Sequence, residues 1–155
     1  MKNKLSLAGS IALCLAAGGL GSIATSAKIP TWYVTLAKPA WNPPNWIFAP
    51  VWTTLYILMA TAAWMVWTRR EQAGARAALG LFGVQLVLNT LWSFLFFGAE
   101  NPGLAMVEIV VLWIAIAATI WTFREIHSAA AWLLAPYLAW VSFASCLNFA
   151  IWRLN

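Results

Sequence analysis

Residues 104–123 read LAMVEIVVLWIAIAATIWTF, an apolar run in which Glu108 is the one charged side chain. A transmembrane α-helix needs about 20 consecutive apolar residues to cross a hydrocarbon core roughly 30 Å thick. The run is continuous and lacks the alternation of apolar and polar residues that a membrane β-barrel strand requires. This stretch therefore predicts a helix that spans a membrane.

Four further stretches have the same length and character. The predicted spans are Leu5–Ala27, Trp46–Thr68, Ala77–Gly98, Leu104–Phe123 and Ala129–Trp152. The composition agrees, because 63% of the residues are hydrophobic, 8% are charged and the mean hydropathy is +0.79. Soluble domains carry about 25% charged residues. The sequence predicts an all-α fold, in which residues 1–155 form a single domain, an integral membrane bundle of five transmembrane helices.

The first run has a second interpretation. Its basic start, apolar stretch and small residues Ala24–Ala27 are also typical of a secretory signal peptide. However, small residues recur four positions apart, as in Ala17 with Gly21 and Gly18 with Ser22. This spacing lets transmembrane helices approach closely. The composition of this run leaves the two interpretations balanced.

Basic residues give a net charge of +5 and lie in short clusters between the apolar runs. A basic stripe along one face is absent, so we do not expect a nucleic-acid partner. Five spans place Lys2, Lys4, Arg69, Arg70, Arg76 and Arg124 on one side of the membrane and Lys28, Lys38 and Arg153 on the other. The positive-inside rule then predicts a cytoplasmic N-terminus.

No metal site and no resident cofactor are expected. Cys14, Cys146 and His127 do not have the spacing of metal ligands, and the two cysteines lie at different predicted depths. Glu108 is an isolated acid inside a span, so it must be paired, hydrogen-bonded or protonated. A hydrogen bond to a neighbouring helix is at least as good an interpretation as a proton-relay or ligand role. A channel is disfavoured because Glu108 has no series of polar partners.

The connection from Lys28 to Asn45 is the one long loop between predicted spans. It interleaves four prolines with aromatic residues: Pro30, Pro39, Pro43 and Pro44 with Trp32, Tyr33 and Trp41. Proline fixes φ and removes a hydrogen-bond donor, so the loop is predicted to be stiff and non-helical. We favour a lid over a pocket, and an aromatic anchor at the membrane interface is the alternative.

Polar side chains recur at helical spacing within the third predicted span. Gln85, Asn89, Trp92, Ser93 and Phe96 form one stripe at about 100° per residue. Such side chains usually face the bundle interior or a cavity, so we interpret them as pocket lining. Another face of the same span carries Gly80, Gly83, Val87 and Leu91. This second face predicts either a homodimer contact or tight packing within the chain.

The fifth and second spans repeat the pattern. Tyr137, Trp140 and Asn148 share one face of the fifth span, and Trp52 lies one turn before Tyr56 in the second. Indole rings with a few amides suit a large, flat, mostly apolar ligand. For any single ring, simple packing in the core is the default interpretation.

These motifs resemble the TspO family, the tryptophan-rich sensory proteins related to the mitochondrial translocator protein (peripheral benzodiazepine receptor). The first loop carries Trp32-Tyr33-x-x-Leu36-x-Lys38-Pro39-x-Trp41-x-Pro43-Pro44, followed by Pro50-x-Trp52-x-x-Leu55-Tyr56. The third span carries Gln85-x-x-x-Asn89-x-x-Trp92-Ser93-x-x-Phe96-Phe97-Gly98. The fifth carries Pro136-Tyr137-Leu138-x-Trp140 and Leu147-Asn148-x-x-Ile151-Trp152-x-Leu154-Asn155. The matches extend from the first loop to the last residue.

The resemblance implies a retained first helix, a homodimer and an outward pocket under the first loop. It also implies binding of protoporphyrin IX or haem-type tetrapyrroles, and of sterols in animal members. Together with the helix faces, it predicts these ligand-binding residues: Trp32, Tyr33, Trp52, Tyr56, Gln85, Asn89, Trp92, Tyr137, Trp140 and Asn148. The function predicted is that of a membrane receptor or transporter-like protein.

An enzyme that degrades protoporphyrin IX in light is the alternative function, and the resemblance assigns that chemistry to Trp52 and Trp140. No other catalytic residues are expected. The sterol motif of animal members places Tyr between an aliphatic and a basic residue, whereas this chain has Phe149 between Leu147 and Arg153. A tetrapyrrole is therefore the preferred ligand, and the chain is predicted to be a bacterial member in a bacterial membrane, inner or outer.

Overall fold

The computed structural model describes residues 2–155, with side chains from Lys4 onward. Five long helices make up most of this range: α1 (Lys2–Lys28), α2 (Phe48–Trp67), α3 (Ala75–Ser93), α4 (Pro102–Ile126) and α5 (Ser128–Leu154). Short turns are η1 (Tyr33–Thr35), η2 (Asn45–Ile47) and the π-helical η3 (Phe94–Gly98). All five helices are long and apolar enough to cross a membrane, and residues 2–155 contain no strand. The predicted all-α membrane bundle of five helices is confirmed.

Local sequence explains where the helices begin. Gly74, just before α3, has a φ of 82°, a left-handed conformation that glycine adopts without a steric penalty. The Asn101 side chain accepts a hydrogen bond of 2.9 Å from the Leu104 N–H and so caps α4. Pro102 follows in the first turn, where its missing N–H costs nothing.

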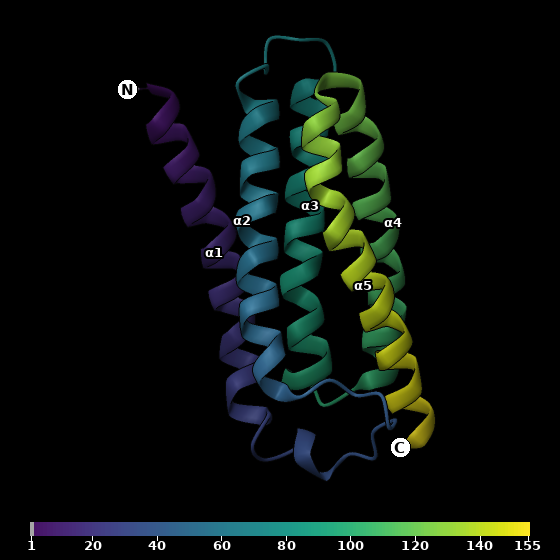
Figure 1. Cartoon of the computed structure of the whole chain (residues 1–155). Coiled ribbons are helices and arrows are strands. Elements are labelled where there is room, and N and C mark those ends of the chain that lie inside the picture. Colours follow the sequence, from purple (N-terminus) through teal and green to yellow (C-terminus); the bar gives the residue numbers. More distant parts are fainter. Residues whose placement is uncertain (1) are drawn as a thin grey trace.

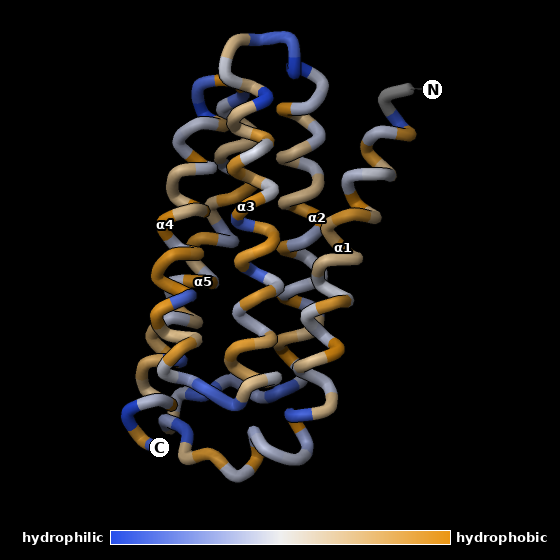
Figure 2. Tube along the Cα trace, turned by 180° about the vertical axis from the view of Figure 1, so that it is seen from behind, coloured by the Kyte–Doolittle hydropathy of each residue, from blue (hydrophilic) through white to orange (hydrophobic). Residues whose placement is uncertain are grey.

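The helices lie side by side in one bundle (Figure 1), and their contacts close it into a ring. α1 packs on α2 and α3, α4 lies between α3 and α5, and α5 returns against α2. The first loop covers one end of this ring, and the short α2–α3 connection lies at the opposite end. Figure 2 shows hydrophilic residues concentrated at the two ends and apolar residues along the helices. The outward faces expose many large apolar side chains, as a surface in contact with lipid requires.

α1 is packed into the bundle through small residues. Gly18 lies directly against the ring of Tyr56, and a Cβ at Gly21 would be 3.0 Å from the Ser93 hydroxyl oxygen. The Thr90 hydroxyl donates to the Ala17 carbonyl at 3.2 Å. The Ala17–Gly21 spacing therefore marks a helix contact, as the retained-helix interpretation predicts.

The glycine face of α3 points out of the bundle. Added Cβ atoms at Gly80 and Gly83 would meet nothing within 4 Å, and the nearby Val87 is 68% exposed. Tight packing within the chain, one of the two interpretations of this face, is therefore wrong. The face is free in the subunit.

Candidate ligand-binding cavity

A cavity of about 310 Å³ lies inside the ring of helices, beneath the first loop. All five helices contribute to its wall, and none of the described residues that line it carries a charge. Its aromatic lining consists of Tyr33, Phe48, Trp52, Tyr56, Trp92, Phe96, Phe97 and Trp140. Ligand pockets of about 300–1,000 Å³ are typically apolar with a few convergent polar groups. The size and lining therefore suit a mostly apolar organic molecule.

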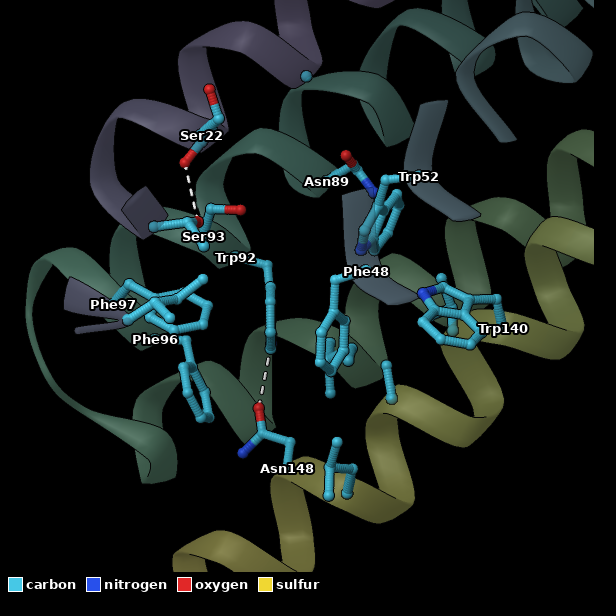
Figure 3. A pocket seen from close by; sticks show the side chains of 18 of the residues that line it. Ser22, Phe48, Trp52, Asn89, Trp92, Ser93, Phe96, Phe97, Trp140 and Asn148 are labelled. Atoms are coloured by element: carbon cyan, nitrogen blue, oxygen red, sulfur yellow. Dashed lines mark hydrogen bonds between the residues drawn. The ribbon is translucent and has the colours of Figure 1, made fainter. Parts of the chain in front are cut away.

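Four rings frame one side of the cavity, and Figure 3 labels three of them, Phe48, Trp52 and Trp140. Phe48 begins α2 and meets Trp140 of α5 at 6.1 Å between ring centroids, with their planes 70° apart. Trp52, one turn further along α2, lies 5.7 Å from Tyr56 with the two planes 32° apart. Because these rings come from two different helices, they present separate aromatic surfaces to the same space.

The indole nitrogens divide the cavity tryptophans into two kinds. Trp92 donates its Nε1–H to Asn148 Oδ1 at 3.0 Å (Figure 3), and Asn148 Nδ2 donates in turn to the Pro102 carbonyl at 2.7 Å. Trp92 thereby ties α3 to α5 and to the start of α4. For Trp52 and Trp140, the described chain offers no hydrogen-bond acceptor to the indole N–H. Those two donors remain available inside the cavity.

A buried chain of hydrogen bonds lies at the deep end of the cavity. Tyr56 donates to Asn89 Oδ1 at 2.5 Å, and Asn89 Nδ2 donates to the Tyr137 hydroxyl at 3.1 Å. Tyr137 donates onward to Gln85 Oε1 at 2.8 Å. This chain fixes both ends of the Asn89 amide while leaving one of its two N–H donors unused. Asn89 therefore reaches the cavity as a positioned polar group.

Aromatic packing attaches the first loop to the end of α3. The Trp32 ring meets Phe96 at 5.7 Å and Phe97 at 6.3 Å, and Tyr33 meets Phe97 at 5.6 Å. The π-helical turn η3 buries both phenylalanines, although they are adjacent in sequence. Such π-turns are frequent at functional sites. The widened turn thus supplies two neighbouring rings on which the loop sits.

Polar contacts stiffen the loop from within. Lys38 Nζ donates to the carbonyls of Tyr33 and Leu36 at 2.6 and 2.8 Å. The Tyr33 hydroxyl donates to Asn42 Oδ1 at 2.9 Å. Burial raises the pKa of Tyr33 above its ordinary value, and the hydrogen bond to Asn42 opposes that shift. The loop is therefore held in a defined conformation, although Tyr33–Thr35 form a 3₁₀ turn in a loop whose prolines predict a non-helical chain. Because Tyr33 also lines the cavity, the loop covers it, and we call this loop the lid.

Most of the predicted ligand-binding residues meet at this cavity. Tyr33, Trp52, Tyr56, Asn89, Trp92, Trp140 and Asn148 line it. Trp32, Gln85 and Tyr137 are outside its lining: Trp32 belongs to the first loop and packs on Phe96, whereas Tyr137 and Gln85 belong to the hydrogen-bonded chain at the deep end of the cavity. Their part in ligand binding stays a prediction.

Sequence reasoning missed part of the wall. Phe48 was hidden in a uniformly apolar stretch, and the small polar side chains of α1, Ser22, Thr25 and Ser26, gave no signal beyond helix contact. The structure brings them to the same cavity as the aromatic residues of α2 and α5.

Glu108 is buried, and neither of its carboxylate oxygens has a hydrogen-bond partner within the described chain. A hydrogen bond from Glu108 to a neighbouring helix, one of the alternatives left open by the sequence, is therefore not found in the described chain. Glu108 is also outside the cavity lining, although Ile109 and Leu112, next to it on α4, belong to that lining. Groups of three or more potential metal ligands do not occur among residues 2–155.

A sequence model of the TspO/MBR family matches residues 10–153. The chain belongs to the TspO/MBR family. It is 48% identical over 158 residues to the tryptophan-rich protein TspO of Chlorobaculum tepidum, and this alignment covers 99% of this chain and 98% of that protein. It is 45% identical over 153 residues to TspO of Archaeoglobus fulgidus, with 99% of each chain covered. The translocator protein of Sus scrofa is 44% identical over 128 residues, or 80% of this chain and 75% of that protein.

TspO/MBR membership confirms the resemblance drawn from the loop and helix motifs. Together with the five apolar spans, it makes the chain an integral membrane protein, and its similarity to bacterial TspO supports a bacterial membrane. Membership also supports a receptor-like or transporter-like role for the TspO/MBR chain.

Proposed function

We propose that the chain binds a porphyrin, such as protoporphyrin IX, in the cavity beneath the first loop. The observation that carries this proposal is the paired aromatic surface of Phe48 with Trp140 and of Trp52 with Tyr56, facing a space of about 310 Å³. A flat, conjugated ligand gains both area burial and ring contacts against such surfaces.

The polar groups suit the same ligand class. Trp52 and Trp140 keep free indole N–H donors, and Asn89 keeps one amide donor at the cavity floor. A tetrapyrrole carries nitrogen and carboxylate acceptors around an otherwise apolar body, so these donors can fix its orientation. A sterol offers a single hydroxyl, and Phe149, where a sterol motif needs Tyr, is 49% exposed on the outer surface.

Quenching of tryptophan fluorescence during titration with protoporphyrin IX tests the proposal. We expect saturable quenching. We also expect Trp52→Phe to weaken binding by roughly tenfold, because it removes part of the aromatic surface together with the indole N–H donor. Trp132→Phe is the matched control, because Trp132 lies near the start of α5, is 75% exposed and does not line the cavity. Non-saturable quenching in folded protein, or equal affinities in both variants, contradicts the proposal.

A second candidate function is light-dependent degradation of protoporphyrin. The observation that favours it is the presence of both Trp52 and Trp140 in the cavity lining. Illumination of the protein with bound protoporphyrin is expected to give a new product spectrum that Trp52→Phe and Trp140→Phe abolish. Bleaching at the same rate in the variants rules out a role for these rings.

We also propose a homodimer through the face of α3 that contains Gly80 and Gly83. The proposal is supported by the free space around both glycines and by the exposed Val87 beside them. Small residues permit close contact between helices in lipid. Gly83→Phe is expected to convert dimers to monomers in detergent, as measured by light scattering. A dimer that persists in this variant places the interface elsewhere.

A further inference from the structure

One side-chain amide joins the end of α5 to the middle of the lid. The Ala37 N–H donates to Asn155 Oδ1 at 3.0 Å, and Asn155 Nδ2 donates back to the Ala37 carbonyl at 2.9 Å. The same Nδ2 donates to the Ile151 carbonyl at 2.8 Å. Asn155 thus pairs with both backbone groups of Ala37, as a neighbouring strand would, while remaining fixed to the last turn of α5.

This pairing differs from the other polar contacts of the lid. Between residues 33 and 44, the remaining hydrogen bonds in the described chain join residues of the first loop to one another, as Lys38 and Asn42 do. The other attachments are aromatic, including Trp41 against Phe143 at 5.8 Å. Within the described chain, Asn155 is therefore the polar connection between residues 33–44 of the lid and the helical bundle.

The position of the pairing relates it to the cavity. Ile151, which holds the Asn155 amide, is buried in the cavity wall and packs in the same cluster as Tyr33 of the lid. Asn155 itself is exposed, so water can compete for its hydrogen bonds. Exposed hydrogen bonds open more readily than those in a packed core. The lid can consequently be released at this point while the aromatic core beneath it stays intact.

We propose that Asn155 is a positioning residue that latches the lid over the cavity and thereby slows ligand release. The part concerning ligand release rests on the proposed function, whereas the part concerning the lid does not. Asn155 is not required to touch the ligand, because it acts through the backbone of Ala37.

Hydrogen–deuterium exchange tests the latch without ligand. In nanodiscs, the Ala37 amide is expected to exchange about tenfold faster in Asn155→Ala than in the unmodified protein, the effect of losing two modest hydrogen bonds. Asn155→Asp should fall between them, because its carboxylate can accept from the Ala37 N–H but cannot donate to the carbonyl. Leu154→Ala is the matched control, since Leu154 is 53% exposed and is not part of the pairing. Unchanged exchange in α3 and α5 shows that the fold persists.

Stopped-flow dissociation of protoporphyrin IX tests the consequence. We expect several-fold faster release from Asn155→Ala and no change in Leu154→Ala. Equal Ala37 exchange in Asn155→Ala and the unmodified protein overturns the latch, and faster exchange with unchanged release overturns its role in retention. If the unmodified protein binds no porphyrin, the proposed function fails, and the ligand-free exchange still decides the latch.

Discussion

Gly18→Ala tests whether α1 forms the wall of the cavity. A Cβ at Gly18 would lie 2.8 Å from Tyr56 Cδ2 and 2.9 Å from Tyr56 Cζ, and closer still to Cε2. Either α1 or the tyrosine ring must move. Overpacking of this kind costs about 1–3 kcal/mol. Gly19→Ala is the matched control, because a Cβ there meets nothing within 4 Å.

The comparison of these two variants isolates the steric effect. Both gain the same helix propensity, about 1 kcal/mol for Gly to Ala. The free energies of unfolding should therefore differ by about 1–3 kcal/mol, or roughly 3–9 °C in Tm for a chain of this size. Because Tyr56 donates to Asn89, Gly18→Ala should also weaken porphyrin binding, whereas Gly19→Ala should not.

Cys14 provides the assay. Its thiol is fully buried in the core cluster that contains Tyr56, so a thiol-reactive fluorophore reports the unfolding of this region during heating. Cys146 is exposed and is replaced by serine in every version. Equal melting temperatures for Gly18→Ala and Gly19→Ala would refute the close packing of α1 on Tyr56.

Three further predictions concern the floor, the rim and the opposite end of the bundle. Tyr137→Phe removes a hydroxyl that makes two buried hydrogen bonds. Each is worth roughly 0.6 kcal/mol in a membrane protein, and some are stronger, so the free energy of unfolding should fall by about 1–2 kcal/mol. An unchanged melting curve contradicts the network. Glu100→Gln breaks the half-exposed ion pair with Lys28, and the free energy of unfolding should fall by less than about 1 kcal/mol. A larger fall in the same melting assay would contradict this expectation. Burial, and to a lesser degree the charge of Arg69, lower the pKa of His127 from its ordinary 6.5. The folded protein therefore favours the neutral imidazole, and its stability declines as the pH falls below about 6.5. In Arg69→Gln the pKa of His127 measured by NMR should rise, and an identical titration excludes the influence of Arg69.

The sequence was sufficient to predict the bundle and much of the cavity. Long apolar runs determine the spans, because lipid leaves few alternatives to a helix. The spacing of Asn89 and Trp92 then places both on the inner face of α3, where the structure finds them in the cavity lining.

Depth within the bundle could not be predicted in the same way. Gln85 lies on the same stripe as Asn89, but Tyr137 crosses from α5 and closes the floor between Gln85 and the cavity. Helical periodicity reports the direction of a side chain and not how far a pocket extends. That extent depends on which large rings from other helices fill the interior.

The sequence also does not show which cavity tryptophans are held by hydrogen bonds and which keep a free N–H. Trp52 and Trp92 both face the cavity, yet Trp92 is held by Asn148, whereas Trp52 keeps its donor free. Phe48 was overlooked because a phenylalanine in an apolar run is ordinarily core. The packing of α2 against α5 gives it a place opposite Trp140.

A structure of the protein with bound protoporphyrin IX tests the central claim most directly. We predict that the macrocycle lies in the cavity beneath the lid, against Trp52 and Trp140, with its polar edge near the free N–H of Asn89. A porphyrin bound on the outer, lipid-facing surface, with the cavity rings in the same positions as without ligand, would contradict the account.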